Sequence, residues 1–269
     1  MNIIKYMIAD FHNDFLTSGS GNIQEISKKT ACAVCAVYRG ARSYYDIVNI
    51  VHGFLKDRPK NLYLGLEDVG YADESNLDEI CSWRPVYVSL TWNGRNELAG
   101  GCGASGGLTD KGRRAVRRFA AEKIPIDCAH LNAESFREVL DCGAFPVDSH
   151  TCLNAVWRHA RNLDDRQVKE ITARGGLIGI TFVEKFLCAG RANAEDVFRH
   201  VDHGVQACGP KNFCLGTDYF GADRFAAGLE NYEGEEELRI CFLKRGYSRT
   251  DIDRIFAQNL QNFLSKKVF

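Results

Sequence analysis

The sequence lacks an excess of charge of one sign, long apolar runs and low-complexity tracts. Its 34 Lys and Arg residues nearly balance 35 Asp and Glu residues, so the net charge is -1 and gives no electrostatic reason to expect nucleic acid or an anionic membrane as a partner. No apolar stretch reaches the roughly 18 residues that a membrane-spanning helix requires. Since no linker or internal repeat is visible, residues 1–269 are expected to form one domain.

A secretory leader is also missing from the start of the sequence, where a strand-like run begins almost at once. The eleven cysteines are therefore expected to be reduced thiols of a cytoplasmic protein, because Cys32, Cys35, Cys128 and Cys214 lie inside apolar runs. Cys32 and Cys35 have the C-x-x-C spacing of redox and zinc motifs. Residues three apart in a strand point to opposite faces, which excludes a shared ion.

The sequence does contain a regular alternation of β-rich runs and helical segments. The β-rich runs span residues 3–11, 31–38, 62–67, 86–92, 124–130, 145–150, 177–183 and 212–218. The helical segments, recognised by apolar spacing and capping residues, span 44–56, 111–122, 133–140, 165–174, 194–208 and 249–264. This alternation predicts an α/β fold with a parallel sheet, and the length fits a single (β/α)8 TIM barrel of about 250 residues.

Polar residues close one predicted strand after another. His12 and Asp14 follow the first run, and Glu67, His130 and His150 end later ones. The C-terminal ends of barrel strands meet at one rim, where barrel enzymes build their active sites. Because imidazoles and carboxylates without sulfur suit zinc or a similar divalent ion, the sequence predicts a metal-dependent hydrolase.

Each of these residues also has a simpler structural interpretation. His12 and Asp14 share one face of a strand and can reach one ion, but an H-x-D pair also arises by chance. Glu67 can bridge two cations about 3.5–4 Å apart, or it is an ordinary loop carboxylate. His130 and His150 end consecutive strands at equivalent positions, which favours a shared ion. The remaining histidines fit structural roles better: His52, His159, His200 and His203.

Two further residues follow strands, and one loop is rich in glycine. Asp218 closes the last strand, where it can take a proton from metal-bound water and pass it to a leaving amine. Arg161, after the sixth strand, either clamps a substrate carboxylate through two parallel hydrogen bonds or forms a surface salt bridge. The stretch Gly100–Gly107 lacks the Gly-Lys-Ser/Thr ending of a phosphate loop and predicts a flexible loop over the barrel mouth.

Eleven segments follow one another in the order in which they occur in a known family: Phe11–Asp14, Gly65–Asp68, Ser89–Asn93, Gly107–Gly112, Ile126–His130, Pro146–His150, Arg161–Leu163, Gly175–Gly179, His200–His203, Gly216–Asp218 and Lys244–Tyr247. In these segments the chain resembles the membrane or renal dipeptidase family, the zinc dipeptidases of peptidase family M19, and in particular its bacterial-type members. The resemblance extends over nearly the whole chain.

The resemblance implies a barrel with two Zn²⁺ ions. In such a site His12 and Asp14 hold one ion, His130 and His150 hold the other, and Glu67 bridges the two. The implied reaction is hydrolysis of L,L- or L,D-dipeptides by a hydroxide held between the ions. Other divalent ions stay open, and a homodimer is a further possibility.

The resemblance also implies the substrate contacts. Asp218 matches the aspartate that handles the proton, and Arg161 matches the arginine that binds the C-terminal carboxylate of the dipeptide. Trp92 replaces a histidine that contacts substrate in the renal enzymes, and we expect Trp92 and Asn93 to contact substrate here.

Two departures leave alternatives open. The first departure is Trp92, and the second is the segment of 52 residues between Asp14 and Glu67, which is short for the family. Both leave open that the protein hydrolyses another small amide, such as a lactam or an N-acyl amino acid. A non-catalytic barrel is the remaining alternative. It is disfavoured because all five ligand positions are filled.

Overall fold

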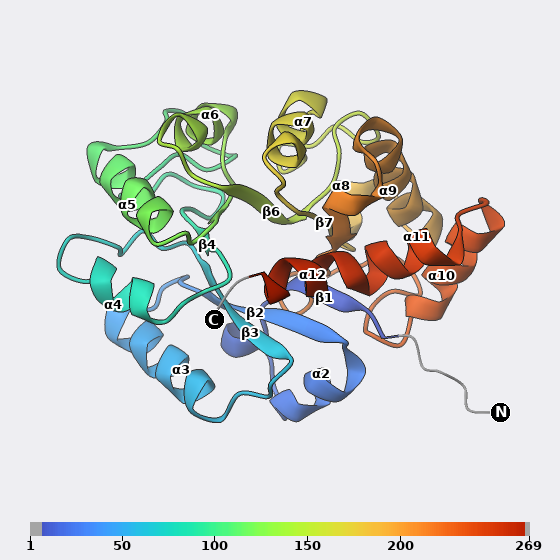
Figure 1. Ribbon diagram of the computed structural model, residues 1–269, viewed down its shortest axis with the longest axis horizontal. Coiled ribbons are helices and arrows are strands. Elements are labelled where there is room, and N and C mark those ends of the chain that lie inside the picture. Colours follow the sequence, from blue (N-terminus) through green and yellow to red (C-terminus); the bar gives the residue numbers. More distant parts are fainter. Residues whose placement is uncertain (1–6, 267–269) are drawn as a thin grey trace.

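A closed barrel of eight parallel strands forms the centre of the computed structural model, which describes residues 7–266 (Figure 1). The strands are β1 Ala9–Asn13, β2 Cys32–Tyr38, β3 Leu62–Glu67, β4 Val88–Ser89, β5 Ile126–Asp127, β6 Pro146–Thr151, β7 Ile178–Ile180 and β8 Phe213–Leu215. Each strand pairs with the next, and β8 closes on β1 through Leu215 and Asp10. The predicted TIM barrel is confirmed.

Each predicted run overlaps one strand, although several strands are shorter than their runs, and β1 and β6 extend one or two residues beyond theirs. The strands β4 and β5 have two residues each. Beyond β5, His130 has a positive φ of 68°, so the backbone is no longer extended where this residue enters the site. The first run begins at residue 3, and its residues 3–6 lie outside the described part of the chain.

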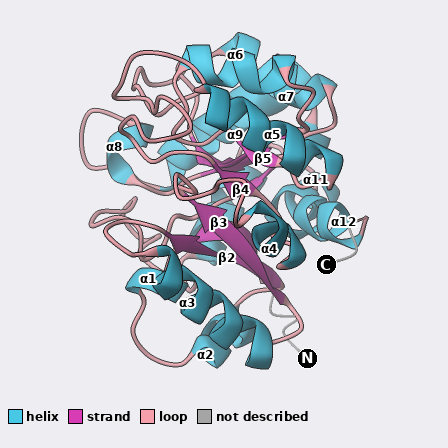
Figure 2. Cartoon of the chain, turned by 90° about the vertical axis from the view of Figure 1, so that its left-hand side faces the viewer, coloured by secondary structure: helices cyan, strands magenta, loops and turns pink. Residues whose placement is uncertain are grey.

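Helices surround the strands on the outside of the barrel (Figure 2). They are α1 Phe15–Ser18, α2 Ile23–Lys29, α3 Tyr44–Asp57, α4 Leu77–Ser82, α5 Asp110–Ala121, α6 Ala133–Asp141, α7 Asp165–Ala173, α8 Glu184–Leu187, α9 Ala194–Cys208, α10 Glu235–Lys244, α11 Arg249–Asp253 and α12 Asn259–Ser265. Five of the six predicted helices are confirmed within one residue at each end. The predicted helix 249–264 is divided into α11 and α12 by a π-helical turn over Arg254–Gln258.

Local sequence explains why the long helices begin where they do. Ser43 accepts the backbone N–H of Asp46, and the Asp46 carboxylate accepts the backbone N–H of Ser43, which is a capping box at the start of α3. The same arrangement starts α7 and α9. In α5 the apolar residues Val116 and Phe119 are three apart and fully buried, so this helix packs on the barrel through one face.

The two faces of the strands pack in separate apolar clusters. One cluster brings Cys32 and Val34 of β2 together with Tyr87 and with Leu260 of α12, which crosses the barrel end in Figure 1. Cys35 belongs to the larger cluster, which includes many helix residues. Cys32 and Cys35 therefore point to opposite faces, as predicted, and in the described part of the chain all eleven cysteines are free.

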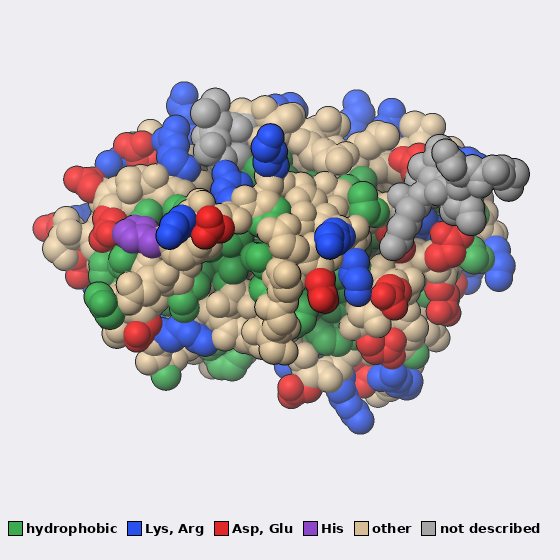
Figure 3. All heavy atoms as spheres, turned by 90° about the horizontal axis from the view of Figure 1, so that it is seen from below, with side chains coloured by type: hydrophobic (Ala, Val, Ile, Leu, Met, Phe, Trp, Pro, Cys, Tyr) green, Lys and Arg blue, Asp and Glu red, His purple; other side chains and the backbone are tan. Residues whose placement is uncertain are grey.

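The surface carries charges of both signs. On the face seen from below, Lys and Arg side chains alternate with Asp and Glu side chains (Figure 3). Within residues 7–266, no helix has both the length and the apolar character needed to cross a membrane.

Asp10 is a fully buried carboxylate that joins the first and last strands. It accepts hydrogen bonds from the backbone N–H of Thr217 at 2.8 Å, from the hydroxyl of Thr217 at 2.9 Å and from the phenol of Tyr232 at 2.6 Å. Next to it, the backbone N–H of Asp218 donates to the carbonyl of His12 at 3.0 Å. These contacts fix the strand ends that carry two of the predicted site residues.

Tyr232→Phe is expected to lower the free energy of unfolding by about 1.5–3 kcal/mol, because it removes a hydrogen bond to a buried carboxylate. Urea unfolding followed by circular dichroism measures this change. Tyr45→Phe is the control, since Tyr45 is 73% exposed and its loss of a hydroxyl should change stability by less than about 0.5 kcal/mol. Equal unfolding midpoints for the two variants would contradict this prediction.

Candidate active site

The predicted ligands converge at the C-terminal ends of the strands, where Glu67 lies between two groups of side chains. The Nε2 atom of His12 is 3.3 Å from Asp14 Oδ2 and 3.5 Å from Glu67 Oε2. The Nε2 atom of His130 is 3.0 Å from Glu67 Oε1 and 2.9 Å from His150 Nε2. All five residues are buried. The two oxygens of Glu67 thus face different ligand groups, which is the arrangement of a bridging carboxylate.

These separations fit divalent ions. A tetrahedral ion with bonds of about 2.0–2.1 Å holds its ligand atoms about 3.3 Å apart. The observed separations of 2.9–3.5 Å are close to that value. Two triplets of ligand atoms, each within 4.8 Å of one another, can hold an ion: His12 with Asp14 and Asp218, and Glu67 with His130 and His150.

The tautomers of two histidines favour a metal ion over a proton. His130 donates from Nδ1 to Asn93 Oδ1 at 2.9 Å. His150 donates from Nδ1 to Ser149 Oγ at 2.8 Å, because the Ser149 hydroxyl itself donates to Asp127 at 2.6 Å. Both Nε2 atoms therefore carry lone pairs that face each other. Burial lowers the pKa of both histidines well below the usual value, so a cation between them relieves the repulsion.

The buried negative charge of the carboxylates also favours bound cations. Burial, with the charge of Asp14, raises the pKa of Glu67 to about 7. Burial raises the pKa of Asp218 well above its ordinary value, and the charges of Asp14 and Glu67 add to this. The buried Oδ1 atom of Asp14 has no hydrogen-bond partner among the described residues. Buried carboxylates this close together need positive charge to be stable.

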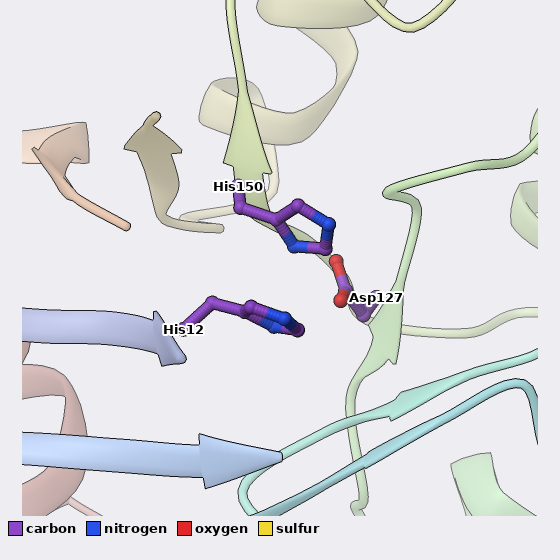
Figure 4. Close-up of side chains that lie close together, drawn as sticks. All are labelled: His12, Asp127 and His150. Carbon is purple, nitrogen blue, oxygen red and sulfur yellow. The ribbon is translucent and has the colours of Figure 1, made fainter. Parts of the chain in front are cut away.

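Asp127 forms a third triplet with His12 and His150, and the three side chains point toward one another in Figure 4. The Oγ atom of Ser149 occupies the space among them, 2.6 Å from Asp127, 2.8 Å from His150 Nδ1 and 3.3 Å from His12 Nδ1. His12 Nδ1 also lies 2.7 Å from the hydroxyl of Tyr87. The two imidazoles are therefore oriented through their Nδ1 atoms, on the side away from the other ligand candidates, by Asp127, Ser149 and Tyr87.

Close backbone packing holds the carboxylates of Asp14 and Asp218 in place. Asp218 has a positive φ of 63°, an uncommon conformation for a residue other than glycine. A Cβ atom on Gly221 would collide with the carboxylates of Asp14 and Asp218, so a larger residue here would displace them. The backbone N–H of Asp14 donates to the carbonyl of Tyr219 at 2.9 Å, which ties the two loops together.

The predicted substrate residues lie around this centre. Arg161 is buried, donates from Nη2 to the carbonyl of His150 at 3.0 Å, and has no partner for its buried Nε among the described residues. Trp92 is 46% exposed, and its ring lies 6.3 Å from that of His130. The side-chain oxygen of Asn93 is bound by His130, so in this structure Asn93 orients a ligand candidate. A contact of Asn93 with substrate stays a prediction.

Asn93→Ala is expected to weaken the affinity for the ion near His130 by about 10–100-fold, because the imidazole loses the partner that fixes its tautomer and orientation. Zinc titration against a competing chelator measures this affinity. Asn231→Ala changes an exposed asparagine whose side chain, among the described residues, binds only the nearby backbone of Glu233, so it is the matched control and should bind zinc as the wild type does. Equal affinity in both variants would show that His130 needs no such support.

The glycine-rich loop and the remaining histidines have structural contacts. The backbone N–H of Cys102 donates to the carbonyl of His130 at 2.6 Å, and Asn132 donates to the carbonyls of Ala104 and Gly106. These hydrogen bonds hold the loop against the site, at the barrel mouth where it was expected, and its flexibility stays a prediction. His200 is buried and binds two backbone groups, and His203 lies 2.9 Å from Asp165, as expected for structural roles.

Comparison with known proteins places this chain in a family. Residues 63–267 match the model of the membrane dipeptidase family, peptidase family M19. An uncharacterized protein in the pqqA 5' region of Klebsiella pneumoniae is 28% identical over 182 residues, which cover 62% of this chain and 67% of that protein. Dipeptidase verJ of Clonostachys rogersoniana is 29% identical over 179 residues, which cover 65% of this chain but only 46% of that protein.

A solved structure shares the fold over its full length. The metallopeptidase of Rhodobacter sphaeroides, in complex with a phosphinate mimic of the dipeptide L-Ala-D-Ala, has a TM-score of 0.82 at 20% identity and covers 97% of this chain and 99% of its own. The match to the family model extends from β3 to beyond α12 and includes Glu67, His130, His150 and Asp218. The chain belongs to the membrane dipeptidase family, peptidase family M19.

Proposed function

We propose that the chain is a dinuclear zinc dipeptidase that hydrolyses L,L- or L,D-dipeptides. The observation that carries this proposal is the position of Glu67, whose two oxygens lie 3.5 Å from His12 and 3.0 Å from His130. One carboxylate facing two ligand groups is what a two-ion site requires. Membership in the dipeptidase family supports the same reaction.

The residues divide into two ion sites. His12 and Asp14 would hold one zinc ion, His130 and His150 the other, and Glu67 both. When bound, the ions would polarise the peptide carbonyl and lower the pKa of the attacking water from 15.7 to about 7. The rest of the reaction depends on the side chains around them.

Asp218 and Arg161 supply the remaining chemistry. Asp218 lies with its Oδ1 atom 3.8 Å from His12 Nε2, close enough to the site centre to accept the proton of the water and to return it to the departing amine. The Nε donor of Arg161 is unpaired among the described residues, and the guanidinium group would bind the C-terminal carboxylate of the dipeptide. The bond from Arg161 to the carbonyl of His150 fixes the orientation of the guanidinium group.

Two similar proteins support the choice of substrate. The structure from Rhodobacter sphaeroides contains a mimic of L-Ala-D-Ala, and the relative from Clonostachys rogersoniana is a dipeptidase. We therefore include dipeptides with a D-residue at the second position among the expected substrates.

A dipeptide panel tests this proposal. The protein is reconstituted with zinc, its metal content is measured, and release of amino acids from L-Ala-L-Ala and L-Ala-D-Ala is followed. About two zinc ions per chain and turnover of at least one dipeptide are expected. Full zinc occupancy without turnover of any dipeptide would overturn the proposal.

A second candidate is hydrolysis of N-acyl amino acids at the same site. It is favoured by the exposed ring of Trp92, which lies 5.8 Å from the ring of Tyr38 and gives the site an aromatic border suited to an acyl chain. The rates for L-Ala-L-Ala and N-acetyl-L-alanine separate the two candidates. Faster hydrolysis of the dipeptide excludes the second one.

A further inference from the structure

Tyr38, at the C-terminal end of β2, lies next to the bridging carboxylate. In the register of the two strands, Tyr38 pairs with Glu67 of β3. Paired residues of neighbouring strands direct their side chains to the same face of the sheet. Cys32 and Val34, which precede Tyr38 by even numbers of residues, belong to the cluster inside the barrel. The same alternation directs the Tyr38 side chain inward, to the side of Glu67.

Ring contacts place Tyr38 at the border of the ion sites. Its ring lies 5.8 Å from the ring of Trp92, which in turn lies 6.3 Å from the ring of His130. Arg42 donates to the Tyr38 carbonyl at 3.3 Å and holds the backbone at the strand end. The Tyr38–Trp92 pair therefore forms an aromatic border on the side of the site where Glu67 and His130 meet.

The Tyr38 hydroxyl is available to a ligand. Tyr38 is only partly buried, and the described residues show no hydrogen bond that involves its hydroxyl. Burial raises the pKa of Tyr38 to about 12, and the charges of Glu67 and Asp14 contribute, which places the phenol in the electric field of the site. Since even an unperturbed tyrosine has a pKa near 10, the hydroxyl keeps its proton at neutral pH.

The imidazole N–H groups of the site are already in use. Those of His130 and His150 donate to Asn93 and Ser149, and Nδ1 of His12 contacts the Tyr87 hydroxyl. A carbonyl oxygen of the substrate therefore receives no hydrogen bond from these rings. Tyr38 is partly exposed, faces the same side of the sheet as Glu67 and has a hydroxyl that can donate.

We propose that the Tyr38 hydroxyl donates a hydrogen bond to the scissile carbonyl oxygen of the substrate, and that this bond strengthens as negative charge develops on that oxygen. The proton stays on Tyr38 throughout, so the residue stabilises charge and transfers nothing. Such a donor acts mainly in the transition state, because a hydrogen bond to an oxyanion is stronger than one to a neutral carbonyl. This inference rests on the proposed dipeptidase function.

Tyr38→Phe tests the inference because it removes the hydroxyl and keeps the ring against Trp92. Steady-state kinetics on the best dipeptide of the panel should show kcat/KM lowered by about 10²–10³-fold, the loss seen when one such donor is removed. The loss should fall on kcat, with KM changed by less than about threefold, since the bond forms chiefly in the transition state. Tyr45→Phe, an exposed tyrosine of α3, is the matched control and should keep wild-type kinetics.

Binding provides a second measurement that does not depend on turnover. The affinity for a phosphinate analogue of Ala-Ala, measured by calorimetry on the zinc-loaded protein, should fall in Tyr38→Phe by about the factor lost in kcat/KM, because such an analogue resembles the transition state. Zinc content should stay at the wild-type value.

The outcomes separate this inference from the proposed function. If the wild type hydrolyses dipeptides and the Tyr38→Phe variant is equally active, the inference about Tyr38 is overturned and the proposed function stands. A variant that loses activity but binds the phosphinate as tightly as the wild type also overturns it. A wild type that is loaded with zinc and hydrolyses no dipeptide overturns both.

Discussion

Glu67→Gln is expected to lower kcat/KM for a dipeptide by about 10³-fold or more and to reduce the zinc content to about one ion per chain. The amide keeps the shape of the side chain but has only one oxygen. Because Oε1 and Oε2 of Glu67 face His130 and His12, the NH₂ group of glutamine must point at one of the two ligand groups. The ion on that side would lose a ligand, and loss of that ion would remove one of the two positive charges that lower the pKa of the attacking water.

Zinc analysis after dialysis and steady-state kinetics measure the two effects. Asp68→Asn is the matched control, since Asp68 is the neighbouring carboxylate and its Oδ1 accepts a hydrogen bond from Asn96 at 2.7 Å. Asn tolerates the positive φ of 57° at this position, so the control keeps its backbone. A Glu67→Gln protein that keeps about two zinc ions and wild-type activity would rule out a bridging role for Glu67.

The positions of the strands could be predicted well because each one combines β-forming residues with a turn at its end. The run 62–67 coincides with β3, and 31–38 differs from β2 by one residue. The runs 86–92 and 124–130 are longer than their strands, since residues after Ser89 and Asp127 leave the ladder to form the site. Apolar character continues past the hydrogen-bonded pairs and hides where a strand ends.

The short helices had weaker signals. The helices α1 and α8 have four residues each, too few to show a helical period. The helix predicted at 249–264 has a continuous apolar pattern, and nothing in it reveals the π-helical turn at Arg254–Gln258. Such a turn depends on how the segment packs on β8 and β1, which a one-dimensional pattern does not contain.

At the site, the sequence identifies the ligand candidates at the ends of the strands. It does not identify the residues that bind and orient these ligand candidates. The five ligand candidates and Asp218 stand where strands meet the rim, and the structure brings all six together. Asp127 and Ser149 were missed, although a carboxylate inside the apolar run 124–130 was a visible signal. Tyr87 showed no signal in the sequence, because its contact with His12 joins residues 75 positions apart.

The second prediction with a large expected effect concerns Asp218, the carboxylate that lies nearest to the ligand groups without being assigned to an ion. Asp218 forms a triplet with His12 and Asp14 and could in principle be a ligand itself. Its Oδ1 atom lies 3.8 Å from His12 Nε2, farther than the 3.3 Å between His12 Nε2 and Asp14 Oδ2. The longer separation makes Asp14 the better ligand beside His12 and leaves Asp218 for the role of a general base.

Asp218→Asn is therefore expected to lower kcat for a dipeptide by about 10²–10⁴-fold, because the amide cannot accept and return the proton. KM and the zinc content should stay near their wild-type values, since asparagine tolerates the φ of 63° and keeps the loop against Asp14. Asp223→Asn, an exposed carboxylate of the same loop, serves as the control and should retain full activity. If Asp218→Asn instead loses one zinc ion, Asp218 is a ligand, and another group must carry the proton.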